Sequence, residues 1–261
     1  FFFKQKTAYE IKECDWSSDV CSSDLPVLSL TKGLDPRTGE RLSTLVHGRP
    51  VAVLSGPNMV EEIAAGLPGV AVIASTDEAL ALQLQELINS VVFRVYVNSD
   101  VLGVELCGAA KNVIALAAGG VDGLRLGDSA KAAIITRGLY EMSRLGAAVG
   151  ADPETFAGLA GMGDLVVTCW HASGRNRRAG ELIARGRTPE QARAEIGQVV
   201  EGLTTAPVLR ELSRRVGVEL PITEGVCAVL DGRPLSELAG GLMGRRPTDE
   251  RSSGSRVPAA R

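Results

Sequence analysis

The chain has 261 residues, of which 45% are hydrophobic and 23% charged, with a formal net charge of −3. This predicts one large or two modest folded domains, and the charge gives no reason to expect nucleic acid or an anionic membrane surface as a partner. No apolar run reaches the roughly 18 residues of a membrane span. Five Cys without a CxxC pair and two His exclude a His-rich metal centre and favour a reducing cytoplasm.

Residues 1–25 differ in composition from the rest of the chain. They hold five of the ten aromatic residues and three of the six Lys. They show neither a hydrophobic period nor the basic start and apolar centre of a signal peptide. The stretch resembles translated sequencing-adaptor read-through, and a native disordered tail is the alternative. We therefore expect residues 1–25 to be non-native or disordered, and the Ser-, Arg- and Pro-rich residues 251–261 to be disordered.

The first half of the remaining chain alternates strand and helix. Short apolar runs predict strands at residues 26–33, 51–57, 70–75 and 93–97. Helices are expected between them, one of them beginning at Thr76 as N-cap. This alternation predicts a mostly parallel α/β sheet, in which ligands bind beyond the carboxyl ends of the strands. Lys32 and Gly56 both follow such an end, although ordinary turn chemistry explains them equally well.

From Asp100 onward no convincing strand is present. Capping residues predict helices that begin near Thr188, where Thr-Pro-Glu-Gln forms a capping box, and near Thr205 and Thr223. We therefore expect an α/β domain over residues 26–98 and an all-helical domain over residues 99–250.

Residues 104–120 form the most informative stretch, because they predict a helix that is apolar nearly all round and therefore buried. Lys111 lies in its middle, and burying an unpaired ammonium is costly. After residue 25 the chain has 22 Arg but only three Lys, namely Lys32, Lys111 and Lys131. These positions are candidates for needing a compact ammonium that titrates; the alternative is chance in a small sample.

Two further segments carry candidate chemistry. The Gly-rich run at residues 158–165 presents one carboxylate, Asp164, which is the natural partner of a desolvated Lys111; an ordinary helix N-cap is the alternative. Residues 173–178 open a helix whose N–H groups, together with Arg175 and Asn176, suit a phosphate. A solvated basic helix start is equally compatible with that segment.

Six short motifs follow one another along the chain: Lys32-Gly33, Ser55-Gly-Pro57, Gly108-Ala-Ala-Lys-Asn-Val113, Gly161-Met-Gly-Asp-Leu165, Arg175-Asn-Arg-Arg178 and Gln198-Val-Val-Glu-Gly202. In this order and spacing the chain resembles the bacterial type of NAD(P)-dependent glycerol-3-phosphate dehydrogenase, over residues 26–250. One motif would be weak evidence, whereas six in register are specific. The resemblance implies a partial Rossmann α/β domain, without its first βαβ units, followed by an all-α substrate domain.

The resemblance also implies an activity, namely hydride transfer between NAD or NADP and a small phosphate ester. Dihydroxyacetone phosphate and sn-glycerol 3-phosphate would be interconverted for phospholipid precursor synthesis. Lys111 matches the general acid that protonates the carbonyl oxygen and acts as base in reverse. The implied catalytic residues are Lys111, Asp164, Asn112 and Thr168. The implied substrate contacts are Lys32, Gly56, Asn58, Lys111, Asp164, Gly174, Arg175 and Asn176. The implied cofactor contacts are Lys32, Val60, Arg175, Val199 and Glu201, and no metal is implied.

The chain departs from the family pattern at three places. Asn58 stands where Ser or Thr is usual, and Gly174 stands where many bacterial members have Ser. No strand followed by GxGxxG precedes Pro26, although that element places the pyrophosphate in a Rossmann domain. We therefore expect about 60 residues to be absent at the start, with weak dinucleotide binding and slow turnover as the consequence.

Two other functions stay open at this point. One is a different Lys-dependent dehydrogenase of the Rossmann-plus-helical kind, acting on another hydroxy acid. The other is a non-catalytic helical association module, since the family's helical domain also suits packing between subunits, and a homodimer is compatible with either. The sequence does not distinguish NAD from NADP.

Overall fold

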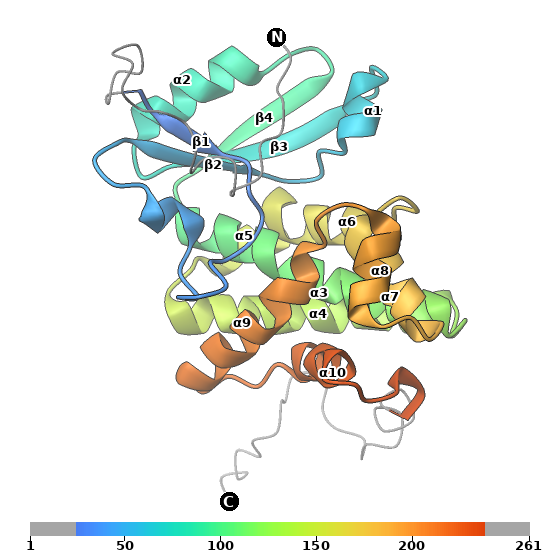
Figure 1. Ribbon diagram of the computed structural model, residues 1–261. Coiled ribbons are helices and arrows are strands. Elements are labelled where there is room, and N and C mark those ends of the chain that lie inside the picture. Colours follow the sequence, from blue (N-terminus) through green and yellow to red (C-terminus); the bar gives the residue numbers. More distant parts are fainter. Residues whose placement is uncertain (1–24, 238–261) are drawn as a thin grey trace, which may run out of the picture.

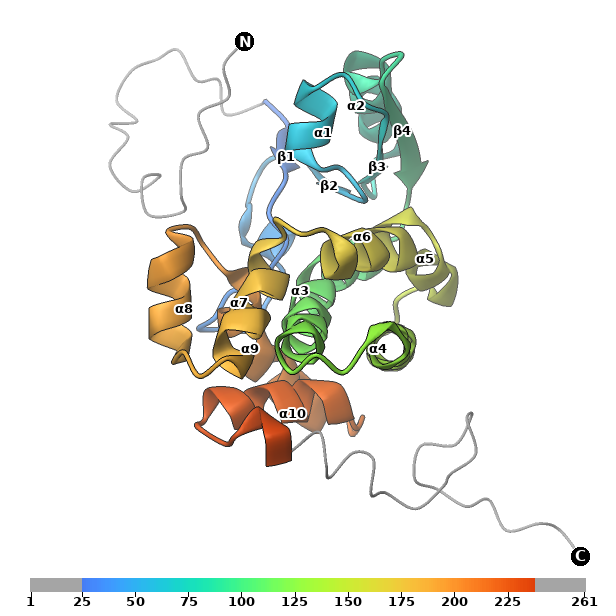
Figure 2. The ribbon, with the colours of Figure 1, turned by 90° about the vertical axis from the view of Figure 1, so that its right-hand side faces the viewer.

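The computed structural model describes residues 25–237, in which a four-stranded sheet lies over a larger layer of helices (Figures 1 and 2). The predictions made for residues 1–24 and 251–261 concern segments outside this range.

The sheet contains all four predicted strands, in the order β1-β2-β3-β4. Their bounds are Val27–Ser29, Val51–Ser55, Gly69–Ala74 and Phe93–Asn98. The β1–β2 and β3–β4 pairings are parallel, as predicted, but β2 and β3 are antiparallel. The connection between β2 and β3 contains one short helix, α1 (Val60–Ala64), of five residues.

Alternation along the central strands gives the sheet two buried faces. Leu54, Ile73 and Val95 face one apolar cluster under α2 (Glu78–Ile88). Val53 and Val72 face a second cluster on the side of the helical layer. The N-cap of α2 is Asp77, whose Oδ1 accepts the N–H of Leu80 at 3.1 Å. The prediction of Thr76 was therefore wrong by one residue.

The helical layer is built around one long buried helix, α3 (Val101–Gly123), as the sequence predicted. Its central position is evident in both views, where the other helices surround it (Figures 1 and 2). These helices are α4 (Asp128–Val149), α5 (Pro153–Ala157), α6 (Asp164–Trp170), α7 (Arg175–Ala184), α8 (Pro189–Ile196), α9 (Glu201–Arg215) and α10 (Pro221–Leu230). A π-helical turn, η3 (Leu159–Gly163), leads directly into α6.

Helix α3 is long and apolar enough to cross a membrane, but 83% of its most apolar window is buried inside the fold. It is in closest contact with α7. A Cβ added at Gly119 would overlap the carbonyl of Arg177, and one added at Gly180 would overlap the carbonyl of Leu116. Because these two glycines have no side chain, the backbones of α3 and α7 come into direct contact. This contact fixes the position of α7 along the axis of α3.

Two of the predicted helix starts were wrong. Thr205 lies buried inside α9, four residues after its first residue, Glu201. Thr223 lies in the first turn of α10, which begins at Pro221. The capping box at Thr188 is present, with the Thr188 hydroxyl and the Gln191 side chain exchanging hydrogen bonds with each other's backbone.

The long connection between β1 and β2 runs down from the sheet beside the helices (Figure 1). Its short 3-10 helix, η2 (Leu42–Leu45), is fixed to α3 by one buried carboxylate. Glu105 pairs with Arg41 at 3.0 Å and accepts the backbone N–H of Ser43 at 2.9 Å. The first residues of this connection, including Lys32, are thereby held between the sheet and α3.

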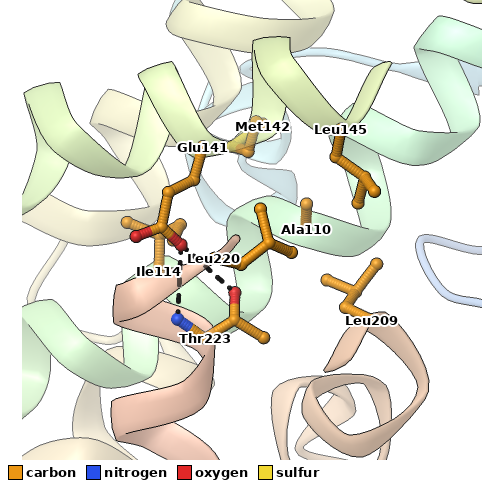
Figure 3. Close-up of a pocket in the computed structure, with 8 residues that line it drawn as sticks. All are labelled: Ala110, Ile114, Glu141, Met142, Leu145, Leu209, Leu220 and Thr223. Atoms are coloured by element: carbon orange, nitrogen blue, oxygen red, sulfur yellow. Dashed lines mark hydrogen bonds between the residues drawn. The ribbon is translucent and has the colours of Figure 1, made fainter. Parts of the chain in front are cut away.

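A second buried carboxylate, Glu141 of α4, closes the N-terminus of α10 (Figure 3). It accepts the N–H of Ile222 at 2.6 Å and that of Thr223 at 3.3 Å. The Thr223 hydroxyl donates to it at 3.5 Å. Apolar side chains, among them Ile114 and Leu220, line the rest of a cavity that is too small to hold a ligand. Burial raises the pKa of Glu141 to about 7, although the two N–H groups act in the opposite direction.

The Glu141→Gln variant is expected to gain stability above pH 7. The pKa of Glu141 is about 7 in the folded chain and 4.5 when the residue is exposed in the unfolded chain. Between these pH values the folded chain binds more protons than the unfolded chain, so its free energy of unfolding falls as pH rises. Gln carries no charge and removes that loss, on the order of 1–3 kcal/mol at pH 8. Urea unfolding at pH 5 and pH 8 measures the difference, with Glu86→Gln on the exposed side of α2 as control. An equal loss of stability at both pH values would contradict the expectation.

Candidate active site

The site is centred on Asp164, whose carboxylate is 2% exposed and binds two lysines at once. Its Oδ1 accepts Lys111 Nζ at 2.6 Å, and its Oδ2 accepts Lys32 Nζ at 2.8 Å. The structure thus brings the carboxylate together with two of the three lysines that the sequence singled out, whereas Lys131 pairs with Asp122.

Three different elements deliver these side chains. Lys111 lies halfway along α3, and Asp164 is the first residue of α6, directly after the π-helical turn. Lys32 follows β1 at the same sheet edge as the end of β2. There Gly56 has φ +125°, and a Cβ on it would lie 3.1 Å from Cα of Ala71. Gly56 is therefore required both by its backbone conformation and by the close approach of β3.

The two ammonium groups also donate hydrogen bonds to neighbouring uncharged oxygens. Lys111 Nζ donates to the hydroxyl of Thr168 at 2.9 Å. Lys32 Nζ donates to the carbonyl of Gly56 and to Oδ1 of Asn58, each at 3.1 Å. Asn58 thus supplies a side-chain oxygen to Lys32.

Burial and the charges in this cluster shift the pKa values of Lys111 and Asp164. Burial, and to a smaller extent the positive charge of Lys32, lowers the pKa of Lys111 to about 8, against the opposing attraction of Asp164. Burial alone would raise the pKa of Asp164, but Lys111 and Lys32 together hold it below its ordinary value. The result is an ionised carboxylate beside an ammonium that can lose its proton near neutral pH.

The two predicted asparagines form a separate buried chain of hydrogen bonds. Asn112 donates to the carbonyl of Lys32 at 3.0 Å and to Glu201 at 2.8 Å. Asn176 donates to Oδ1 of Asn112 at 2.9 Å and accepts the N–H of Gly202 at 2.8 Å. These amides therefore join α3, α7 and α9 and fix the backbone of Lys32. None of these hydrogen bonds of Asn112 or Asn176 involves the Lys111 ammonium.

The remaining predicted residues surround this centre. Gly174 is the N-cap of α7, and a Cβ there would lie 3.1 Å from the carbonyls of His171 and Thr168. Arg175, half-buried, follows it and lies close enough to Glu201 to oppose the rise in the pKa of that carboxyl that burial causes. Val60 and Val199 are exposed apolar side chains.

Sequence reasoning predicted Gly56 as a site residue but missed Ser55, which also contacts the central carboxylate. The Ser55 hydroxyl and the Gly56 N–H both lie 3.4 Å from Asp164 Oδ2. Ser55 belonged to a quoted motif, and its place at the carboxyl end of a buried strand was the available signal. Within residues 25–237, no group of three or more His, Cys, Asp or Glu is arranged to hold a metal ion.

Comparison with known families gives two matches in series. Residues 100–238 match the C-terminal part of NAD-dependent glycerol-3-phosphate dehydrogenase, and residues 10–81 match its N-terminal part. The second match reaches into residues 10–25, which the sequence analysis had set apart.

Individual relatives agree with these matches. The glycerol-3-phosphate dehydrogenase (NAD(P)+) of Cronobacter sakazakii is 50% identical over 237 residues, which cover 88% of this chain and 70% of that protein. The glycerol-3-phosphate dehydrogenase of Coxiella burnetii has a crystal structure that superposes with a TM-score of 0.81 at 39% identity, over 84% of this chain and 69% of that one. A Plasmodium falciparum glycerol-3-phosphate dehydrogenase superposes with a TM-score of 0.78 at 25% identity, over 92% and 70% of the two chains. The chain therefore belongs to the family of NAD(P)-dependent glycerol-3-phosphate dehydrogenases.

Proposed function

We propose that Lys111 is the general acid and base of this chain in the interconversion of dihydroxyacetone phosphate and sn-glycerol 3-phosphate. The observation that carries the proposal is the buried contact of Lys111 with Asp164 at 2.6 Å and with Thr168 at 2.9 Å. Family membership favours this substrate over another hydroxy acid. An acid–base group works best when its pKa lies near the operating pH, and the pKa of about 8 meets that requirement.

The proton balance assigns a task to each neighbour. The reduced nicotinamide, when bound, supplies a hydride to the carbonyl carbon, and Lys111 gives one proton to the carbonyl oxygen. In reverse, neutral Lys111 takes the proton from the hydroxyl. Asp164 stabilises the charged form and Thr168 orients the ammonium. Lys32, which binds the other oxygen of Asp164, is assigned to the substrate oxygen, where an ammonium stabilises developing negative charge.

The phosphate group is assigned to the start of α7. Arg175 supplies a guanidinium, and the N–H groups of the first turn supply further donors at the positive end of the helix dipole. The Gly174 N–H already donates to the carbonyl of His171 at 3.1 Å, so the proposed backbone donors begin at Arg175. The Asn176 amide is used in the buried chain with Asn112, so its proposed contribution to phosphate is its backbone N–H.

The cofactor is assigned to the surface between the sheet edge and α9. Val60 and Val199 offer apolar side chains, exposed by 73% and 56%, that suit the face of a nicotinamide ring. Each is two residues from a group of the central network, Asn58 and Glu201 respectively. Lys32 and Arg175 supply positive charge nearby for the nucleotide phosphates.

The Lys111→Met variant is expected to lose about 10²- to 10⁴-fold in kcat for reduction of dihydroxyacetone phosphate, because the proton donor is gone. The fold is expected to persist, since Asp164 keeps its ion pair with Lys32. Absorbance of the reduced nicotinamide measures the rate. Lys111→Arg keeps the charge but cannot titrate, so it should lose activity as well. Unchanged turnover by Lys111→Met would contradict the acid–base role, whereas a folded chain without turnover before any substitution would favour the association-module alternative.

Reduction and oxidation are expected to depend on pH in opposite directions. Reduction requires protonated Lys111 and should decline above about pH 8, whereas oxidation requires the neutral amine and should rise toward that pH. In Asp164→Asn the carboxylate that raises the pKa of Lys111 is lost, so both limbs should move to lower pH. Rate profiles from pH 6 to 10 test this; limbs that stay in place would contradict the assignment.

The Arg175→Met variant is expected to raise KM for dihydroxyacetone phosphate by about 10- to 100-fold, since a charge-assisted contact with phosphate is removed. Inhibition by inorganic phosphate should weaken by a similar factor. Arg185→Met is the matched control, because Arg185 lies at the far end of the same helix and is exposed. A KM unchanged by Arg175→Met would place the phosphate elsewhere.

We further propose a cytoplasmic location and a homodimer. Cys107, Cys169 and Cys227 are free thiols, all buried, which suits a reducing compartment. Sedimentation equilibrium tests the dimer, and a monomer at micromolar concentration would contradict it.

A further inference from the structure

We propose that Arg177, together with Asp122 and Lys131, is a positioning device that sets the distance between the acid–base group and the phosphate end of the site. This inference rests on the phosphate assignment made above for Arg175. Arg177 lies in a quoted motif and Lys131 is one of the three Lys singled out above, but none of the three residues was assigned a contact with substrate or cofactor.

Arg177 holds the connection between α6 and α7 through its backbone carbonyls. Its Nε donates to the carbonyl of His171 at 3.1 Å, and its Nη2 donates to the carbonyl of Ala172 at 2.9 Å. Its third nitrogen, Nη1, pairs with Asp122 at the end of α3. One guanidinium therefore fastens two consecutive carbonyls of the connection to the central helix, with the side chain only 13% exposed.

Asp122 is itself held by a second cation. Lys131 of α4 donates to Asp122 Oδ2 at 2.8 Å, and its side chain is 7% exposed. The same ammonium lies 4.9 Å from the centre of the Trp170 ring, at the last residue of α6. A cation over an aromatic face is attracted to it, so Lys131 also restrains the end of α6. The cluster thereby joins α3, α4, α6 and α7.

The connection held in this way separates the two halves of the proposed site. Helix α6 carries Asp164 and Thr168, which hold Lys111, and α7 begins with Arg175 only five residues after Trp170. The connection therefore fixes where the phosphate donors lie relative to the Lys111 ammonium. A ligand that spans both would lose affinity if the connection shifted by an ångström, because its two ends could no longer be bound together.

The arrangement also explains why these groups are charged. Removing one charge from a partly buried ion cluster leaves the opposite charges less well compensated, and the backbone then relaxes to solvate them. Asp122 is the carboxylate that both cations share, although Arg177 Nη1 also lies 3.4 Å from Glu181. Loss of the Asp122 charge should therefore loosen Arg177 and Lys131 together.

The experiment compares Asp122→Asn, Arg177→Met and Arg187→Met in the full chain, by calorimetric titration with sn-glycerol 3-phosphate and by steady-state kinetics. We expect Asp122→Asn and Arg177→Met to weaken binding and raise KM by about tenfold or more while kcat changes less than about threefold. The pH at which reduction declines should not move, because Lys111, Asp164 and Thr168 are untouched. Arg187 is exposed and pairs with Glu195 of α8, outside the cluster, so Arg187→Met should match the unmodified chain in every measurement.

The outcomes separate this inference from the phosphate assignment. If Arg175→Met raises KM but Asp122→Asn and Arg177→Met do not, the positioning role is wrong and the phosphate site stands. If Arg175→Met has no effect, the phosphate assignment is wrong and this inference falls with it. Equal losses in kcat and affinity, or a shifted pH profile, would indicate a general structural role and overturn the inference. Asp122→Asn keeps the shape of the side chain and gives the decision if Arg177→Met does not fold.

Discussion

One buried carboxylate holds the two layers of this protein together. Asp164 lies where the sheet meets the helices, and its two oxygens bind Lys111 of α3 and Lys32 beyond β1. The charges come from positions 53 and 132 residues away in the chain. An ionised carboxylate out of water is stable only when it is paired and hydrogen-bonded. The sheet edge, α3 and α6 must therefore meet in one arrangement, which is also the arrangement that lowers the pKa of Lys111 toward neutrality.

Around this centre, directional hydrogen bonds fix the positions of neighbouring elements along one another, which apolar contacts alone would not do. Asn112 and Asn176 join three helices through amide hydrogen bonds, and Glu105 fixes the β1–β2 connection to α3. Each of these hydrogen bonds forms only when its donor and acceptor are correctly placed and oriented. Apolar contacts supply most of the stability of α3, whereas these hydrogen bonds decide its register against α7, α9 and the sheet.

The use of lysine follows the same logic. All three Lys within residues 25–237 take part in ion pairs with an aspartate, and the side chains are between 6% and 17% exposed. Arginine takes the exposed positions at the ends of α7 and α9. An ammonium is compact enough to enter a crowded interior and titrates there, while a guanidinium spans several acceptors. Arg177, which binds two carbonyls and a carboxylate, shows the second use.

The sequence by itself determined the four strands, the buried central helix, the burial of Lys111 and its pairing with Asp164, because hydrophobic period and an isolated charge in an apolar helix are local signals. Six motifs in register determined the family. Only the tertiary structure decided the antiparallel pairing of β2 and β3, the true starts of α9 and α10, and the contacts of Ser55, Asn112 and Asn176. It alone revealed the Asp122, Lys131 and Arg177 cluster. These features depend on which groups come into contact when segments distant in the sequence fold together. The spacing of residues along the chain does not predict those contacts.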